Sequence, residues 1–141
     1  MPSDDTLLRW LPVLLKAAGA GFIAFFGFLT VAVFVEIGPA VESLIKWGDR
    51  GEAYELMICS IYLTWGVFLW LASANPLAHK LFLDFSVVAN VVHFTVMFVE
   101  GLVMPGEHAH LYGDVALGWA GLIPLAWIWW RVRDIRSSPS P

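Results

Sequence analysis

Six side chains that are polar or contain sulfur recur at steps of three or four residues along the apolar segment 81–104. In order they are Ser86, Asn90, His93, Met97, Glu100 and Met104. That spacing places all of them on one face of a helix. Because the rest of the segment is largely aliphatic or aromatic, such a stripe has to point away from lipid. The segment therefore predicts an inward-facing site on a membrane helix.

A second, weaker stripe lies on the preceding apolar segment, which ends at Asn75-Pro76. It consists of Glu55, Cys59, Tyr62, Gly66 and Ser73. The short link makes the two helices antiparallel neighbours, so we expect the two stripes to face each other. With a rise of about 1.5 Å per residue, Tyr62 and His93 would then lie at the same depth. The sequence predicts a cleft that opens at the end carrying Glu55 and Glu100.

The residue types in this cleft are those that bind a cation or a proton. Carboxylates attract cations, and an imidazole titrates or binds metal near neutral pH. We predict His93 as the central ligand or proton carrier, with Tyr62 and Asn90 orienting it. Thiol and thioether donors favour copper(I), whereas imidazole and carboxylates suit zinc, so the predicted cofactor is a copper or zinc ion. The predicted ligands are His93, Glu55, Glu100, Met97, Cys59, His108 and His110.

Packing explains the same residues in another way. His93 would hydrogen-bond Tyr62 or Asn90 and join two helices. His108 and His110 would be ordinary exposed loop residues, and the cysteine and methionines would fill space. No other histidine lies at the depth of His93, which argues against a haem held by two histidines but leaves a single-histidine pigment open. No serine, cysteine or threonine has a general base at a recognisable spacing, so the interpretation as an enzyme is less favoured.

The composition and the apolar segments indicate which helices position these residues. With 59% hydrophobic and 14% charged residues, the chain has the composition of an integral membrane protein. Its apolar segments predict an all-α, four-helix transmembrane bundle with helices at about 11–37, 53–73, 80–104 and 114–131. These form a single domain, residues 1–136, followed by a disordered tail, 137–141.

The basic residues are distributed unequally between the two ends of this bundle. Arg9, Lys16, Lys80, Arg131, Arg133 and Arg136 fall at the end that holds both termini, against Lys46 and Arg50 at the other. This bias predicts cytoplasmic termini, in a multi-pass protein of the bacterial inner membrane. Between Gly38-Pro39 and Gly51, apolar and charged residues alternate as in a short interfacial helix. We expect a second surface helix at residues 1–10, capped by Ser3.

Three local patterns give further expectations. Small residues on the first helix predict close approach of another helix; they are Ala17, Ala20, Gly21, Ala24 and Gly27. Lys80 and Asp84, four residues apart, predict a local ion pair. Tryptophans near the end of the last helix predict an anchor at the membrane interface; they are Trp127, Trp129 and Trp130.

The layout resembles that of small bacterial four-helix membrane proteins of uncharacterised function. The resemblance rests on Tyr54-Glu55-Leu56-Met57 and Phe82-Leu83-Asp84-Phe85 at the starts of the second and third helices, and it implies no activity. We therefore predict a small membrane protein whose outward-facing cleft binds a cation for transport, sensing or support of a larger complex. One alternative is an accessory or assembly subunit without a site. Another is a membrane enzyme that acts on a lipid-soluble substrate through His93.

The predicted partners follow from the same surface properties. The lipid bilayer is the first, because most of each apolar segment would face it. Helices of other membrane proteins or of a second copy of the chain are the others, since small-residue faces suit helix packing. Nothing in the composition suggests a nucleic-acid partner.

Overall fold

The computed structural model describes residues 2–46 and 51–135, which form helices joined by turns. The long helices are α1 (Asp4–Ala32), α3 (Glu52–Ala72), α4 (Lys80–Val103) and α5 (Asp114–Val132). Shorter elements connect them: α2 (Pro39–Ile45) and the 3₁₀ helices η1 (Pro76–His79) and η2 (His108–Leu111). The predictions made for Arg50, for Arg136 and for the tail at 137–141 concern residues outside the described part.

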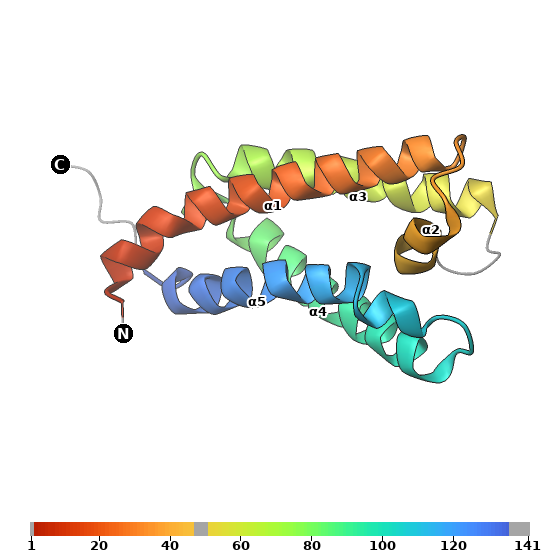
Figure 1. Ribbon diagram of the computed structural model, residues 1–141. Coiled ribbons are helices and arrows are strands. Elements are labelled where there is room, and N and C mark those ends of the chain that lie inside the picture. Colours follow the sequence, from red (N-terminus) through yellow and green to blue (C-terminus); the bar gives the residue numbers. More distant parts are fainter. Residues whose placement is uncertain (1, 47–50, 136–141) are drawn as a thin grey trace.

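Within the described residues, four helical stretches are long and apolar enough to cross a membrane, which confirms the all-helical fold class and agrees with the four predicted spans. α1 lies beside α3 and α4 lies beside α5, so that the bundle consists of two helix pairs (Figure 1). The start of α1 and the end of α5 lie at one end of the bundle, called here the terminal end. α2 and η2 lie at the opposite end, called here the loop end.

The first helix is longer at its start, and ends earlier, than the predicted range 11–37. The Ser3 side chain accepts a hydrogen bond from the Thr6 amide (3.3 Å), which confirms the predicted cap. Residues 4–10 are not a separate surface helix, because α1 continues from Asp4 through Pro12 without a break. Near its other end, β-branched residues crowd the helix and weaken it; they are Thr30, Val31, Val33 and Val35. The other three helices begin and end within one residue of their predicted bounds.

α1 and α3 cross at a pair of glycines. A Cβ atom on Gly19 would lie 2.6 Å from the Gly66 carbonyl oxygen, and one on Gly66 would lie 2.9 Å from the Gly19 oxygen. The close approach predicted for α1 is therefore present, but its centre is Gly19, which was not in the predicted stripe. Gly66 faces α1, so the expectation that it faces α4 is wrong. A Cβ atom on Gly21 would meet nothing within 4 Å.

The terminal end holds the hydrophobic core. Eleven buried residues from all four long helices pack together there: Leu7, Leu11, Leu15, Leu69, Ala72, Leu83, Val87, Leu125, Ile128, Trp129 and Val132. Trp129 is fully buried and donates its Nε1–H to Asp84 Oδ1 (2.8 Å), so it is not the predicted interface anchor. Asp84 also pairs with Arg133 (3.1 Å). The predicted pair of Asp84 with Lys80 is replaced by these contacts from α4 to α5.

Candidate functional site: a cavity between the helix pairs

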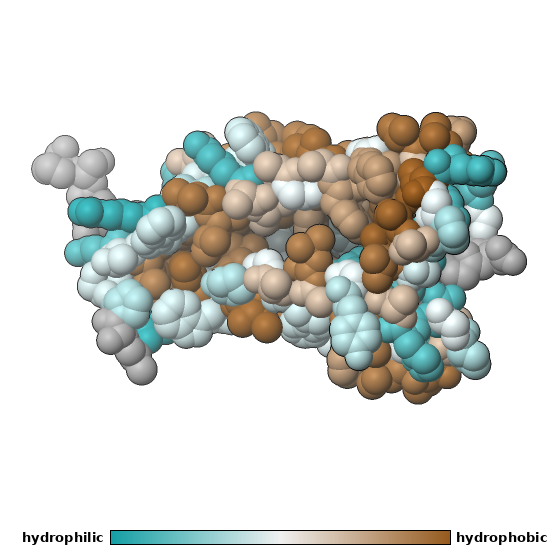
Figure 2. Space-filling model, viewed as in Figure 1, coloured by the Kyte–Doolittle hydropathy of each residue, from teal (hydrophilic) through white to brown (hydrophobic). Residues whose placement is uncertain are grey.

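A cavity of about 690 Å³ lies between the two helix pairs, beyond the core and toward the loop end. All four long helices line it, and Ile45 and Lys46 close its loop end. Figure 2 shows the surface hollowed between α1 and α5, with apolar residues around the hollow and hydrophilic residues gathered at the two ends of the bundle. The volume is in the range of sites that hold a drug-sized molecule.

The predicted stripe on α4 points into this cavity. Five of its six residues line it: Ser86, Asn90, His93, Met97 and Glu100. Glu55 and Cys59 line it from α3, so the structure brings most of the predicted site residues together around one space. The residues of the α4 stripe face the same space because steps of three and four residues keep side chains on one helix face.

Asn90 and Ser86 form the polar floor of the cavity. The side chain of Asn90 is buried, and its Nδ2 donates to the Ser86 carbonyl oxygen (2.8 Å). Its Oδ1 atom has no hydrogen-bond partner within the described residues. Ser86 Oγ accepts from Trp65 Nε1 (2.9 Å), a bond that joins α4 to α3. The floor therefore holds one buried acceptor that protein groups do not satisfy.

His93 lies one helical turn from Asn90, toward the loop end. Its ring is half-buried and contacts the rings of Tyr62 and Phe94, with centroids 5.3 and 5.4 Å away. Neither ring nitrogen makes a hydrogen bond to the residues that the structure describes, so Tyr62 touches His93 without bonding to it. Glu100 and Asp114 line the same cavity as His93.

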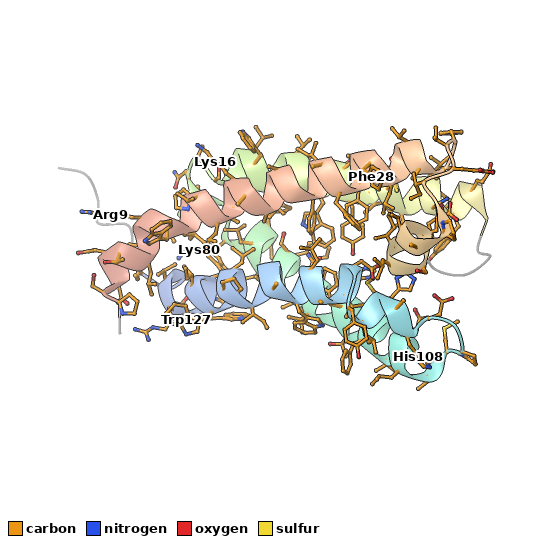
Figure 3. The ribbon with its side chains drawn as sticks, viewed as in Figure 1. Arg9, Lys16, Phe28, Lys80, His108 and Trp127 are labelled. Atoms are coloured by element: carbon orange, nitrogen blue, oxygen red, sulfur yellow. The ribbon has the colours of Figure 1, made fainter. Side chains whose placement is uncertain are left out.

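The remaining predicted ligands lie apart from His93. His108 is exposed at the loop end (Figure 3), where its Nδ1 contacts the Gly101 carbonyl oxygen (2.7 Å). His110 is buried and contacts Asp114 Oδ1 through Nδ1 (3.0 Å) and the Lys46 carbonyl oxygen through Nε2 (3.1 Å). In residues 2–46 and 51–135, no three His, Cys, Asp or Glu side chains are grouped so that they could hold a metal ion.

Comparison with known protein families assigns the chain to one of them. The model of a family of unknown function, DUF6632, matches residues 22–139, which is most of the sequence. The chain belongs to this family. No curated protein and no solved structure gave a match. Membership agrees with the resemblance to an uncharacterised family seen in the sequence, and it assigns no activity.

The walls of the cavity in this DUF6632 protein are the part that the sequence did not predict. α1 contributes aromatic and aliphatic side chains, among them Phe22, Phe25, Phe26 and Leu29. α5 contributes small residues and a proline, among them Gly118, Ala120, Gly121 and Pro124. A Cβ atom on Gly121 would meet nothing within 4 Å, as at Gly21 on the opposite wall. Two glycines at the same depth on two helices could have indicated the cavity from the sequence. Their depths can be compared, however, only once it is known which helices face each other.

Proposed function

We propose that this protein binds a lipid-soluble molecule in the cavity between its two helix pairs. The observation that carries the proposal is the composition of the lining: most of it consists of apolar and small side chains, and the few charged groups lie toward the loop end. A site for a hydrated cation would instead need several ligands at one point, whereas a mostly apolar cavity with few convergent polar groups suits an amphiphilic molecule.

Access from the bilayer supports this proposal. α1 and α5 touch at the terminal end, where Leu11 and Leu15 meet Ile128 and Trp129 in the core. Toward the loop end the two helices separate, and the hollow between them lies in the apolar middle of the surface (Figure 2). A molecule dissolved in the hydrocarbon could enter there without crossing water. Transport, sensing or catalysis would each begin with this binding step.

Proton binding at His93 is a second candidate, and it narrows the cation site predicted from the sequence. It is favoured by the position of His93, whose imidazole lines the cavity and makes no hydrogen bond to the described residues. NMR titration of ¹⁵N-labelled histidine in wild type and His93→Phe tests it. A resonance that titrates between pH 5 and 8 and is lost in the variant would support it, and a His93 ring that stays neutral throughout would exclude it.

Photolabelling tests the main proposal. We expect a long-chain alkane bearing a diazirine, added to the protein in nanodiscs, to label cavity residues such as Phe25 and Leu117. Gly121→Phe and Gly21→Phe should abolish that labelling, because both side chains would enter open space in the cavity. Ala116→Phe and Ala20→Phe are matched controls on exposed positions of the same helices. Equal labelling of the cavity in all four variants would refute the proposal.

The orientation in the membrane is part of the proposal. Arg9, Lys16 and Lys80 lie at the terminal end (Figure 3), together with Arg131 and Arg133 near the end of α5. This bias supports cytoplasmic termini in a bacterial inner membrane, and it puts α2 at the outer interface. The test uses single cysteines in a Cys59→Ala background. A membrane-impermeant maleimide should label Tyr112→Cys in intact cells and Ser3→Cys only after permeabilisation; the reverse pattern would overturn the orientation.

A further inference from the structure

The polar floor of the cavity restricts the chemistry of the molecule that would bind there. This inference rests on the proposed function and concerns the polar group of the ligand. Asn90 is the decisive residue, because it lines the cavity, is 5% exposed and has an unpartnered carbonyl oxygen among the described residues. Leaving a buried acceptor unsatisfied costs free energy of folding, so such groups call for a physical explanation.

The orientation of the Asn90 amide is fixed by its neighbour. Nδ2 donates to the carbonyl oxygen of Ser86, which can only accept. Exchanging the amide nitrogen and oxygen would place two acceptors against each other, so the orphan atom has to be the oxygen. Ser86 Oγ is already engaged by the Trp65 indole and does not serve it. A ligand group that satisfies Asn90 must therefore donate a hydrogen.

An anionic head group does not fit this floor. A deprotonated carboxylate or phosphate has no hydrogen to donate to Asn90 Oδ1, so two acceptors would meet there. Among the described residues that line the cavity, Lys46 carries a positive charge, and it is paired with Glu42 (3.2 Å). This argues against deprotonated fatty acids and phospholipid head groups.

A neutral O–H group fits Asn90 on the floor together with the neighbouring His93. It donates to Asn90 Oδ1, and its oxygen accepts from the N–H of the neutral His93 ring, whose nitrogens are not bonded to described residues. Residues three apart on a helix are neighbours, about 5–6 Å between Cβ atoms, so one hydroxyl can approach both. We infer that the cavity binds a lipophilic alcohol or phenol, with its hydroxyl at Asn90 and His93 and its apolar body between α1 and α5.

A matched pair of probes tests this inference. 4-Nonylphenol and its methyl ether share one apolar body, but the ether has no O–H. Native mass spectrometry of the protein released from micelles measures how much of each stays bound. We expect wild type to hold the phenol about tenfold more tightly than the ether, the size of one hydrogen bond made in an apolar site. Asn90→Leu should remove this preference by weakening the phenol while leaving the ether unchanged.

The possible outcomes distinguish a failure of this inference from a failure of the proposed function on which it rests. Equal binding of phenol and ether to wild type would refute the hydroxyl site while leaving the cavity as a lipophilic site, and the measurement needs no variant that has to fold. No binding of either probe, or binding that persists in Gly121→Phe, would instead refute the proposed function. Tighter binding of 4-nonylaniline than of the phenol would also overturn the inference, by showing that an amine rather than a hydroxyl is selected.

Discussion

The terminal half of the bundle and its loop half are built from similar residues, but they pack differently. In the terminal half, leucines of α1 meet aliphatic residues of the other helices, and Trp129 is completely buried. In the loop half, phenylalanines of α1 and glycines of α5 enclose about 690 Å³ of open space. The hydrocarbon exerts no net hydrophobic force between membrane helices, so packing and hydrogen bonds must hold the pairs together. The terminal half supplies that cohesion, which lets the loop half stay open.

Glycine shows the difference most clearly, since the same residue serves opposite purposes in the two regions. At Gly19 and Gly66 the missing side chain lets two backbones touch. At Gly21 and Gly121 it leaves space that nothing fills. Two residues along α1 thus separate a contact from a cavity wall. The sequence alone shows both as small residues on an apolar helix.

The largest effect is expected at the helix crossing. Gly19→Leu would drive a side chain into the Gly66 carbonyl and the Trp70 backbone, which cannot yield as a side chain can. We expect loss of about 3 kcal/mol or more, seen as aggregation on gel filtration or a collapsed thermal transition in detergent. Gly21→Leu is the control and should change stability by less than about 1 kcal/mol, because its Cβ has room. Equal damage by both would mean that the two glycines do not differ.

An intermediate effect is expected from the contacts that lock α4 to α5. Asp84→Leu leaves the buried Trp129 N–H without its acceptor and removes the ion pair of Arg133 with Asp84. The expected loss is about 1–3 kcal/mol in thermal or denaturant unfolding. Lys80→Gln should have almost no effect, since Lys80 is exposed. If Lys80→Gln were the more damaging of the two, that result would instead support the local ion pair between Lys80 and Asp84 predicted from the sequence.

The sequence predicts what depends on local spacing and fails where the pairing of helices decides. The stripe from Ser86 to Glu100 and the cap at Ser3 were found because helical periodicity and capping are local. Asp84, Gly66 and Trp129 were misassigned because their partners lie on helices that no local pattern identifies. The walls of the cavity were missed for the same reason. Their apolar residues resemble lipid-facing ones until α1 and α5 are placed opposite each other.

The smallest effect is expected at His110, where the loop half is closed. Its Nδ1 faces Asp114, and its Nε2 faces the Lys46 carbonyl and Glu107 Oε2 (3.3 Å). All of these groups accept hydrogen bonds, and only the doubly protonated ring donates from both nitrogens. The attachment of α2 should therefore be strongest at low pH, where the imidazole carries its second proton, and should weaken as the pH rises and that proton is lost.

Hydrogen exchange in α2 measures this attachment. We expect its amides to exchange about fivefold faster at high pH than the change in intrinsic rate accounts for, which corresponds to one lost hydrogen bond of about 1 kcal/mol. His110→Gln should remove the dependence on pH, because glutamine does not titrate in this range. His108→Gln should retain it, since His108 is exposed and contacts only Gly101 among the hydrogen bonds described for it. Loss of the dependence in the His108 variant alone would show that the exposed histidine holds the loop end closed.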